Sequence, residues 1–168
     1  MNGHSILSAF GNARTIYNDN SSRFGKFINL FIDAEKNEIS YYTTKTYLLE
    51  KNRVVDYLHG DRSFHIFYAI MKYLPDEIKQ RCHFIDDFEE YNYLGDSVHF
   101  KTLMNDKLVY DGVLRTFDIF ELSDEIVEAI WKLLAFVLAV GNLEYIMSDE
   151  EDGSKQLDHS DCNNPYDR

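Results

Sequence analysis

Cysteine is scarce in this sequence, which has only Cys82 and Cys162. The two residues lie far apart and form no CxxC motif, so the chain lacks the disulfide framework typical of small secreted domains. No basic segment followed by a long apolar stretch begins the sequence, and we therefore expect no signal peptide. These absences favour a reducing compartment, with the cytosol as the simplest setting.

Long apolar runs and basic clusters are also missing. The most apolar segment covers only residues 129–140 and contains Lys132, whereas a helix that crosses a bilayer needs about 20 apolar residues. Lys and Arg total 17 against 29 Asp and Glu, which gives a net charge of −12. Because nucleic acids and anionic lipids bind clustered Lys and Arg, we expect neither nucleic acid nor a membrane as a partner.

The composition that is present is that of a globular domain. Hydrophobic residues make up 45% of the chain, and 12 Phe and 12 Tyr supply large rings for an interior. A chain of 168 residues is long enough for one domain with a substantial core. We expect that domain to cover residues 1–147, followed by an acidic and flexible segment over 148–168.

Apolar spacing in the first third of the chain predicts a helix end and then a β-hairpin. Residues 6–10 indicate the last turns of a helix, which Gly11 and Asn12 end. Residues 27–32 form a nearly continuous apolar run, which predicts a strand buried on both faces. The Tyr- and Thr-rich residues 39–49 predict its hairpin partner, so strands are expected within about 27–49.

The rest of the chain predicts helices separated by loops. Helical spacing favours a helix over 63–74, a short one over 76–82, and a mixed, loop-rich stretch over 83–112. The strongest helix is expected over 124–140, with Ser123 as its N-cap and apolar side chains on most of its circumference. Its predicted apolar stripe consists of Ile126, Ile130, Leu133, Leu134 and Val137.

The polar segment 18–26 carries the most concentrated chemistry. Asn18, Asn20, Ser21 and Ser22 are short amides and hydroxyls that can reach phosphate oxygens or Mg²⁺, and the adjacent Arg23 can neutralise or lock negative charge. Polar loops of this composition are more often simple turns. The residue types alone therefore leave both an ordinary turn and a nucleotide-sensing loop open.

Other polar residues suggest less. The six histidines are scattered without the spacing of a metal site, and the acidic run 86–90 lacks the alternation and central glycine of a calcium loop. Neither cysteine has the surroundings of a nucleophile. Glu50, Lys51 and Arg53 are expected to be ordinary charges at a strand end.

Six segments, in order along nearly the whole chain, resemble the head of the myosin motor. The most specific is 18–26, NDNSSRFGK, which resembles the switch I loop of that family. The others are 6–15, 47–54 (YLLEKNRV, similar to the family's YLLEKSRV), 62–68 (RSFHIFY, similar to RNYHIFY), 91–94 (YNYL), and 131–145, where Ala139 and Val140 replace a family His and Leu. Several collinear matches of this kind favour a shared origin over chance.

The resemblance implies a fold and a set of roles. The fold would be α/β, with strands of the central sheet and helices of the upper cleft subdomain of a P-loop motor head. Asn18 and Asn20 would contact nucleotide phosphates, and Ser21 would lie beside the γ-phosphate and the attacking water. Ser22 would give its hydroxyl to Mg²⁺, and Arg23 would pair with a switch II glutamate. ATP and Mg²⁺ would be the cofactors, and cytoplasmic actin filaments the partner of the complete head.

Two elements that such a head needs are missing from the sequence. Gly25 and Lys26 are not a GxxxxGK[ST] phosphate loop, because Phe27 follows them and position 20 is not glycine. A switch II motif of the DIxGFE type is also missing. We therefore expect an internal piece of a motor head that requires the remaining segments and hydrolyses little ATP alone.

Two alternatives to this reading stay open. The first is a non-catalytic interaction or scaffold protein that keeps part of a myosin-like fold. The second is an α/β domain unrelated to myosin, in which residues 18–23 form an ordinary turn.

Overall fold

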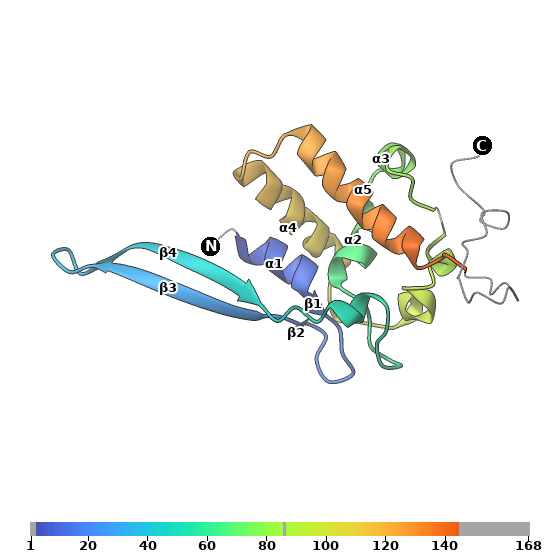
Figure 1. Cartoon of the computed structure of the whole chain (residues 1–168), viewed down its shortest axis with the longest axis horizontal. Coiled ribbons are helices and arrows are strands. Elements are labelled where there is room, and N and C mark those ends of the chain that lie inside the picture. Colours follow the sequence, from blue (N-terminus) through green and yellow to red (C-terminus); the bar gives the residue numbers. More distant parts are fainter. Residues whose placement is uncertain (1–2, 86, 145–168) are drawn as a thin grey trace, which may run out of the picture.

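A helical body and a projecting β-hairpin make up the chain in a computed structural model that describes residues 3–85 and 87–144 (Figure 1). The acidic segment expected over 148–168 lies outside the described residues. The α-helices are α1 (Gly3–Gly11), α2 (His65–Tyr73), α3 (Asp76–Arg81), α4 (Asp106–Ile119) and α5 (Asp124–Val140). The strands are β1 (Asn12–Ala13), β2 (Ser21–Ser22), β3 (Gly25–Asp33) and β4 (Glu38–Tyr47), and short 3₁₀ helices cover Lys51–Val54, Phe88–Glu90 and Gly95–His99.

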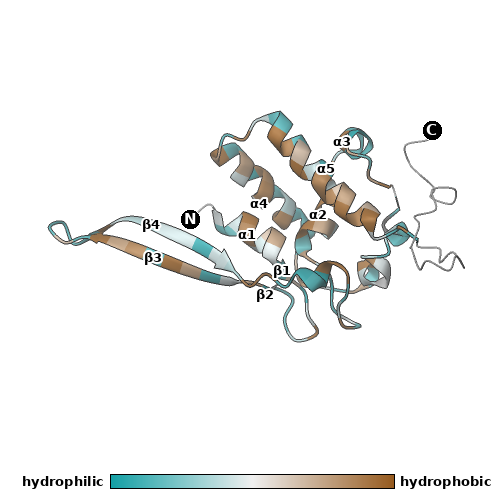
Figure 2. Cartoon of the chain, in the orientation of Figure 1, coloured by the Kyte–Doolittle hydropathy of each residue, from teal (hydrophilic) through white to brown (hydrophobic). Residues whose placement is uncertain are grey.

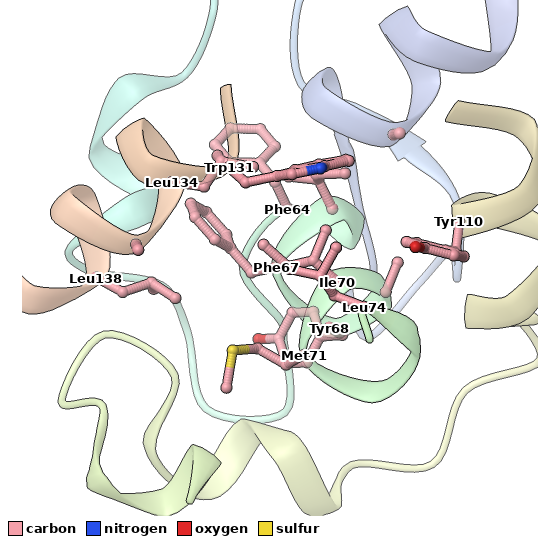
Figure 3. Packing of buried hydrophobic residues seen from close by; sticks show 14 of the residues in the cluster. Phe64, Phe67, Tyr68, Ile70, Met71, Leu74, Tyr110, Trp131, Leu134 and Leu138 are labelled. Carbon is pink, nitrogen blue, oxygen red and sulfur yellow. The ribbon is translucent and has the colours of Figure 1, made fainter. Parts of the chain in front are cut away.

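Helix α2 is the centre of the body. Its side chains from His65 to Met71 are all buried, and it packs against α1 and α4. Phe67 and Ile70 point into the same cluster as Trp131 and Leu138 of α5 (Figure 3). The helix predicted over 63–74 is confirmed, and so are the short helix over 76–82 and the helix that ends at Gly11.

Helix α5 spans the predicted residues, but the prediction that most of its circumference is buried was wrong. The buried residues are Trp131, Leu134, Ala135 and Leu138, which repeat at the spacing of one helical face. Of the predicted stripe, Ile126 and Leu133 are 50% and 62% exposed. Ser123 takes the N-cap position without a side-chain hydrogen bond. Only one face of α5 meets the body, because nothing packs on the other among the described residues.

Helix α4 was missed, since its first residues fell in the stretch predicted to be loop-rich. Asn105 caps it, and its side-chain oxygen accepts hydrogen bonds from the backbone N–H of Lys107 at 3.0 Å and of Leu108 at 3.3 Å. Tyr110, Val113 and Phe117 form its buried face. This spacing of three and four residues was available in the sequence as a helical signal.

The hairpin has the predicted pairing but not the predicted burial. Strands β3 and β4 pair antiparallel from Gly25 with Tyr47 to Asp33 with Glu38, with a register shift after Phe31. Large apolar side chains remain exposed on both strands, among them Phe27, Leu30 and Ile39. Figure 2 shows β3 as hydrophobic along much of its length, away from the helices. A strand is buried on both faces only when layers cover both, and β3 has β4 as its only strand neighbour within the described residues.

No helix in the described part of the chain combines the length and the hydrophobicity needed to cross a membrane.

Candidate functional site

The 18–26 loop is fastened to the start of the helical body through its backbone. Strand β2 pairs antiparallel with β1, so that Ser22 faces Asn12 and Ser21 faces Ala13. The backbone N–H of Arg23 donates to the carbonyl oxygen of Gly11 at 2.8 Å. The two serines predicted in a loop therefore occupy a short strand, and their hydroxyls project from a fixed backbone.

The first part of the loop is a turn stabilised by its own polar groups. Thr15 and Asn18 exchange backbone hydrogen bonds of 2.8 and 3.2 Å, and the Asn18 side-chain oxygen accepts from the Asn20 N–H at 2.8 Å. Asp19 Oδ1 forms an ion pair with Arg14 and lies 3.0 Å from its Nε. The geometry of this contact is not that of a hydrogen bond. Asp19 also accepts from Thr102 Oγ1 at 3.1 Å, which ties the loop to the segment that leads into α4.

Asn20 connects the loop to helix α2. Its side-chain oxygen accepts a hydrogen bond from Asn12 Nδ2 at 3.0 Å and lies 3.2 Å from His65 Nε2. His65 is fully buried, and burial together with the charge of Arg62 lowers its pKa to about 4. The ring is therefore neutral at pH 7, and because Asn20 presents an acceptor, the proton belongs on Nε2.

Arg23 has an acidic partner within the chain. Its Nε donates to Glu50 Oε2 at 2.5 Å, and its Nη1 donates to Ser21 Oγ at 3.0 Å. Glu50 also accepts from Arg53 Nε at 2.8 Å, and Arg53 Nη1 donates to Asp61 Oδ2 at 3.1 Å. We call these five side chains the charged network. The expectation that Glu50 and Arg53 are ordinary charges at a strand end was wrong, since Glu50 joins two arginines and the guanidinium of Arg53 is buried.

The charged network shifts the pKa of two of its members, Glu50 and Arg53. Burial alone raises the pKa of Glu50, but hydrogen bonds and charge from Arg53 and Arg23 outweigh it and lower that pKa below its usual value. Burial disfavours the charged form of Arg53, yet hydrogen bonds to Glu50 and Asp61 raise its pKa. Glu50 is therefore an anion and Arg53 a cation at neutral pH, and both keep their hydrogen bonds.

The loop offers hydroxyl and amide groups that could bind a phosphate or a cation, but the described residues bring no cluster of metal-binding side chains with them. Ser22 is exposed and offers a hard hydroxyl oxygen of the kind that Mg²⁺ binds. The side-chain oxygen of Asn20 already accepts two hydrogen bonds, which leaves its amide N–H groups as the donors of this side chain. Over residues 3–85 and 87–144, no three His, Cys, Asp or Glu side chains are placed to hold a metal ion together. Burial raises the pKa of the Cys82 thiol, in keeping with an unreactive cysteine.

Sequence reasoning singled out Asn18, Asn20, Ser21, Ser22 and Arg23, which the structure places along one continuous segment. Sequence reasoning missed the supports of that segment, which are Glu50, Arg53, Asp61 and His65. The spacing of Glu50 and Arg53 suits a pair on one turn of helix, but no sequence pattern links either residue to Arg23 or to Asp61.

Comparisons with known proteins give one consistent answer. A family model described as Myosin head (motor domain) matches residues 1–165. Unconventional myosin-Id of Danio rerio is 36% identical over 145 residues, which cover 86% of this chain and 14% of that protein. Myosin-2 heavy chain, non muscle, of Acanthamoeba castellanii is 41% identical over 148 residues, 87% of this chain and 10% of that protein. Myosin-6 of Arabidopsis thaliana is 35% identical over 155 residues, 92% of this chain and 10% of that protein.

Proposed function

Since the chain belongs to the myosin head family, we propose that its 18–26 loop is the switch I element of an actin-activated Mg-ATPase motor. The helices and antiparallel strands are an α/β portion of such a head. The observation that carries the proposal is the placement of Ser21, Ser22 and Arg23 on and directly after β2, with Arg23 donating to the Ser21 hydroxyl. An ordinary turn does not require this arrangement.

Five residues of the loop have roles in the proposal. Asn18 and Asn20 bind nucleotide phosphates through their amide groups, and Ser22 supplies a hydroxyl ligand for Mg²⁺. Ser21 orients the attacking water, and Arg23 pairs with a switch II glutamate to close the site. Phosphoryl transfer depends mainly on positioning and charge stabilisation, which is what a hydrogen-bonded serine and arginine supply. When bound, Mg-ATP brings the γ-phosphoryl group that is transferred.

The proposal extends to the parts of the chain, to its partner and to its activity in isolation. Residues 1–147 form part of the motor head, and residues 148–168 are rich in acidic side chains. Actin filaments of the cytoplasm are the partner of the head, and the 168 residues alone hydrolyse little ATP because their sequence has no GxxxxGK[ST] loop. That missing loop also favours a second candidate, a non-catalytic scaffold that retains part of the myosin fold.

The test compares two serine substitutions in the complete protein. Ser22→Ala removes the proposed Mg²⁺ ligand, and we expect actin-activated ATP turnover to fall by about 10²–10³-fold, as when other positioned polar contacts are removed. Ser40→Ala is the matched control, since Ser40 lies on exposed β4, and it should leave turnover unchanged. Equal activity of both variants contradicts the switch I assignment. Actin binding without any ATP turnover in the unmodified protein supports the scaffold instead.

A further inference from the structure

We propose that Glu50 is a positioning residue for the 18–26 loop, holding the guanidinium of Arg23 and, through it, the hydroxyl of Ser21. The ion pair between Glu50 and Arg23 is observed in the structure and does not depend on the proposed function. Its consequence for hydrolysis rests on the proposed function, in which Ser21 orients the attacking water.

The network has a rigid end inside the body. Asp61 and Arg53 are both buried, and Arg53 Nη1 also donates to the carbonyl oxygen of Arg62 at 3.3 Å. The Ser63 hydroxyl donates to the carbonyl oxygen of Arg53 at 3.1 Å, so the backbone of this residue is held as well. Arg53 is therefore a fixed cation, from which Glu50 extends toward the loop.

Glu50 joins this fixed end to the loop through both backbone and side chain. Its backbone N–H donates to the carbonyl oxygen of Arg23 at 2.9 Å, while its carboxylate accepts from Arg23 Nε at 2.5 Å. Arg23 then uses a different nitrogen, Nη1, for Ser21 Oγ. Because the guanidinium is planar and its donors have fixed directions, fixing Nε also fixes the direction of Nη1.

Charge explains why an acid is needed at position 50. Arg23 and Arg53 both donate to the same carboxylate oxygen, Oε2 of Glu50. Without the negative charge, two guanidinium groups would lie close together and repel each other, and Arg23 would leave because Arg53 is held by Asp61. The geometry thus makes Glu50 the link that keeps Arg23 beside Ser21.

The two ion pairs of the charged network differ in exposure. The side chains of Arg23 and Glu50 are 28% and 37% exposed, whereas those of Arg53 and Asp61 are 6% and 3% exposed. A partly exposed ion pair is weaker and more easily exchanged than a buried one. The Arg23–Glu50 ion pair is therefore the weaker part of the charged network, and Arg53 with Asp61 is its fixed part.

The first arm of the test observes the contact directly. In the ¹⁵N-labelled chain, we expect the Arg23 Nε–Hε signal to be shifted and protected from exchange with water. Glu50→Gln should remove both effects, and Glu50→Asp should restore part of them. Glu38→Gln, an acid-to-amide change at the exposed start of β4, is the control and should change neither. An Arg23 signal that is the same in Glu50→Gln overturns the proposal.

The second arm measures the consequence in the complete protein. Losing a hydrogen bond to a charged group should reduce kcat by about tenfold in Glu50→Gln, with little change in KM for ATP. In an Arg23→Gln background the same change should have no further effect, because its target is gone. Additive effects indicate a merely structural role and overturn the proposal. If Ser22→Ala lowers turnover but Glu50→Gln does not, this inference alone fails; if neither does, the proposed function fails.

Discussion

The helical body and the β3–β4 hairpin contain side chains of similar hydrophobicity in very different surroundings. Phe67 and Ile70 in α2 are at most 3% exposed, whereas Phe31 and Ile32 in β3 are 41% and 64% exposed. Helix α2 is surrounded by neighbours, while β3 has one hydrogen-bonded strand beside it and no covering layer among the described residues. An apolar run therefore indicates that a segment can be buried, and its neighbours decide whether it is.

Trp131 gives the strongest test of this comparison. It is nearly fully buried, and the centroid of its ring lies 5.5 Å from the centroid of the Phe117 ring. Trp131→Ala should lower the free energy of unfolding by about 3–5 kcal/mol, because it removes a large buried ring and leaves a cavity. Urea denaturation of the chain measures this, with Phe27→Ala on the hairpin as the matched aromatic control. A loss as large for Phe27→Ala would break the distinction between the two regions.

His65 gives the next largest effect, through pH. Its folded pKa of about 4 lies below the ordinary 6.5, so the unfolded chain binds more protons between these values. Stability should therefore fall as the pH drops through that window, by about 3 kcal/mol in total. His65→Gln should remove this part of the pH dependence, and His99→Gln, at an exposed histidine, should keep it. Urea midpoints of the unchanged chain and of both variants, measured from pH 7 to pH 4, test this prediction. The same pH dependence in His65→Gln as in the unchanged chain would contradict it.

The hairpin gives the smallest effect on folding. Phe31→Thr should lower the free energy of unfolding by no more than about 1 kcal/mol, because Phe31 is 41% exposed and loses one cross-strand ring contact, the stacking on Tyr41. Its effect should appear in association instead, because exposed apolar strand faces and edges favour aggregation. Light scattering of the chain at increasing concentration should show less association for Phe31→Thr than for Asn29→Thr, a change on the same strand that removes no apolar surface. Equal association would show that the exposed apolar face has no role.

The sequence was most informative where neighbours along the chain determine the outcome. Helices α2 and α5 follow from apolar spacing, and the β3–β4 pairing follows from two strand-like runs around a polar turn. Helix α4 carried similar signals in Asn105, Tyr110 and Val113 but lay in a stretch with mixed composition. The burial of β3 and of α5 could not be predicted, because it depends on which surfaces meet in three dimensions.

In the candidate site too, features local in the sequence could be predicted, and contacts between distant residues could not. The residue types of 18–26 mark the loop as a candidate site, and their resemblance to the myosin head family agrees with the family model that matches residues 1–165. The partners of the loop come from positions distant in sequence, such as Glu50 for Arg23 and His65 for Asn20. Contacts of this kind arise only when the body folds, and a single sequence contains no pattern that links them.

Hydrogen exchange in the complete protein tests the central claim most directly. If residues 18–26 are a switch for Mg-ATP, a non-hydrolysable ATP analogue with Mg²⁺ should slow amide exchange over 18–24, and the analogue without Mg²⁺ should do so less. Exchange over the far end of the hairpin, residues 30–40, should stay the same, since that end lies away from the loop (Figure 1). Unchanged exchange over 18–24 in the presence of bound Mg-nucleotide would contradict the account.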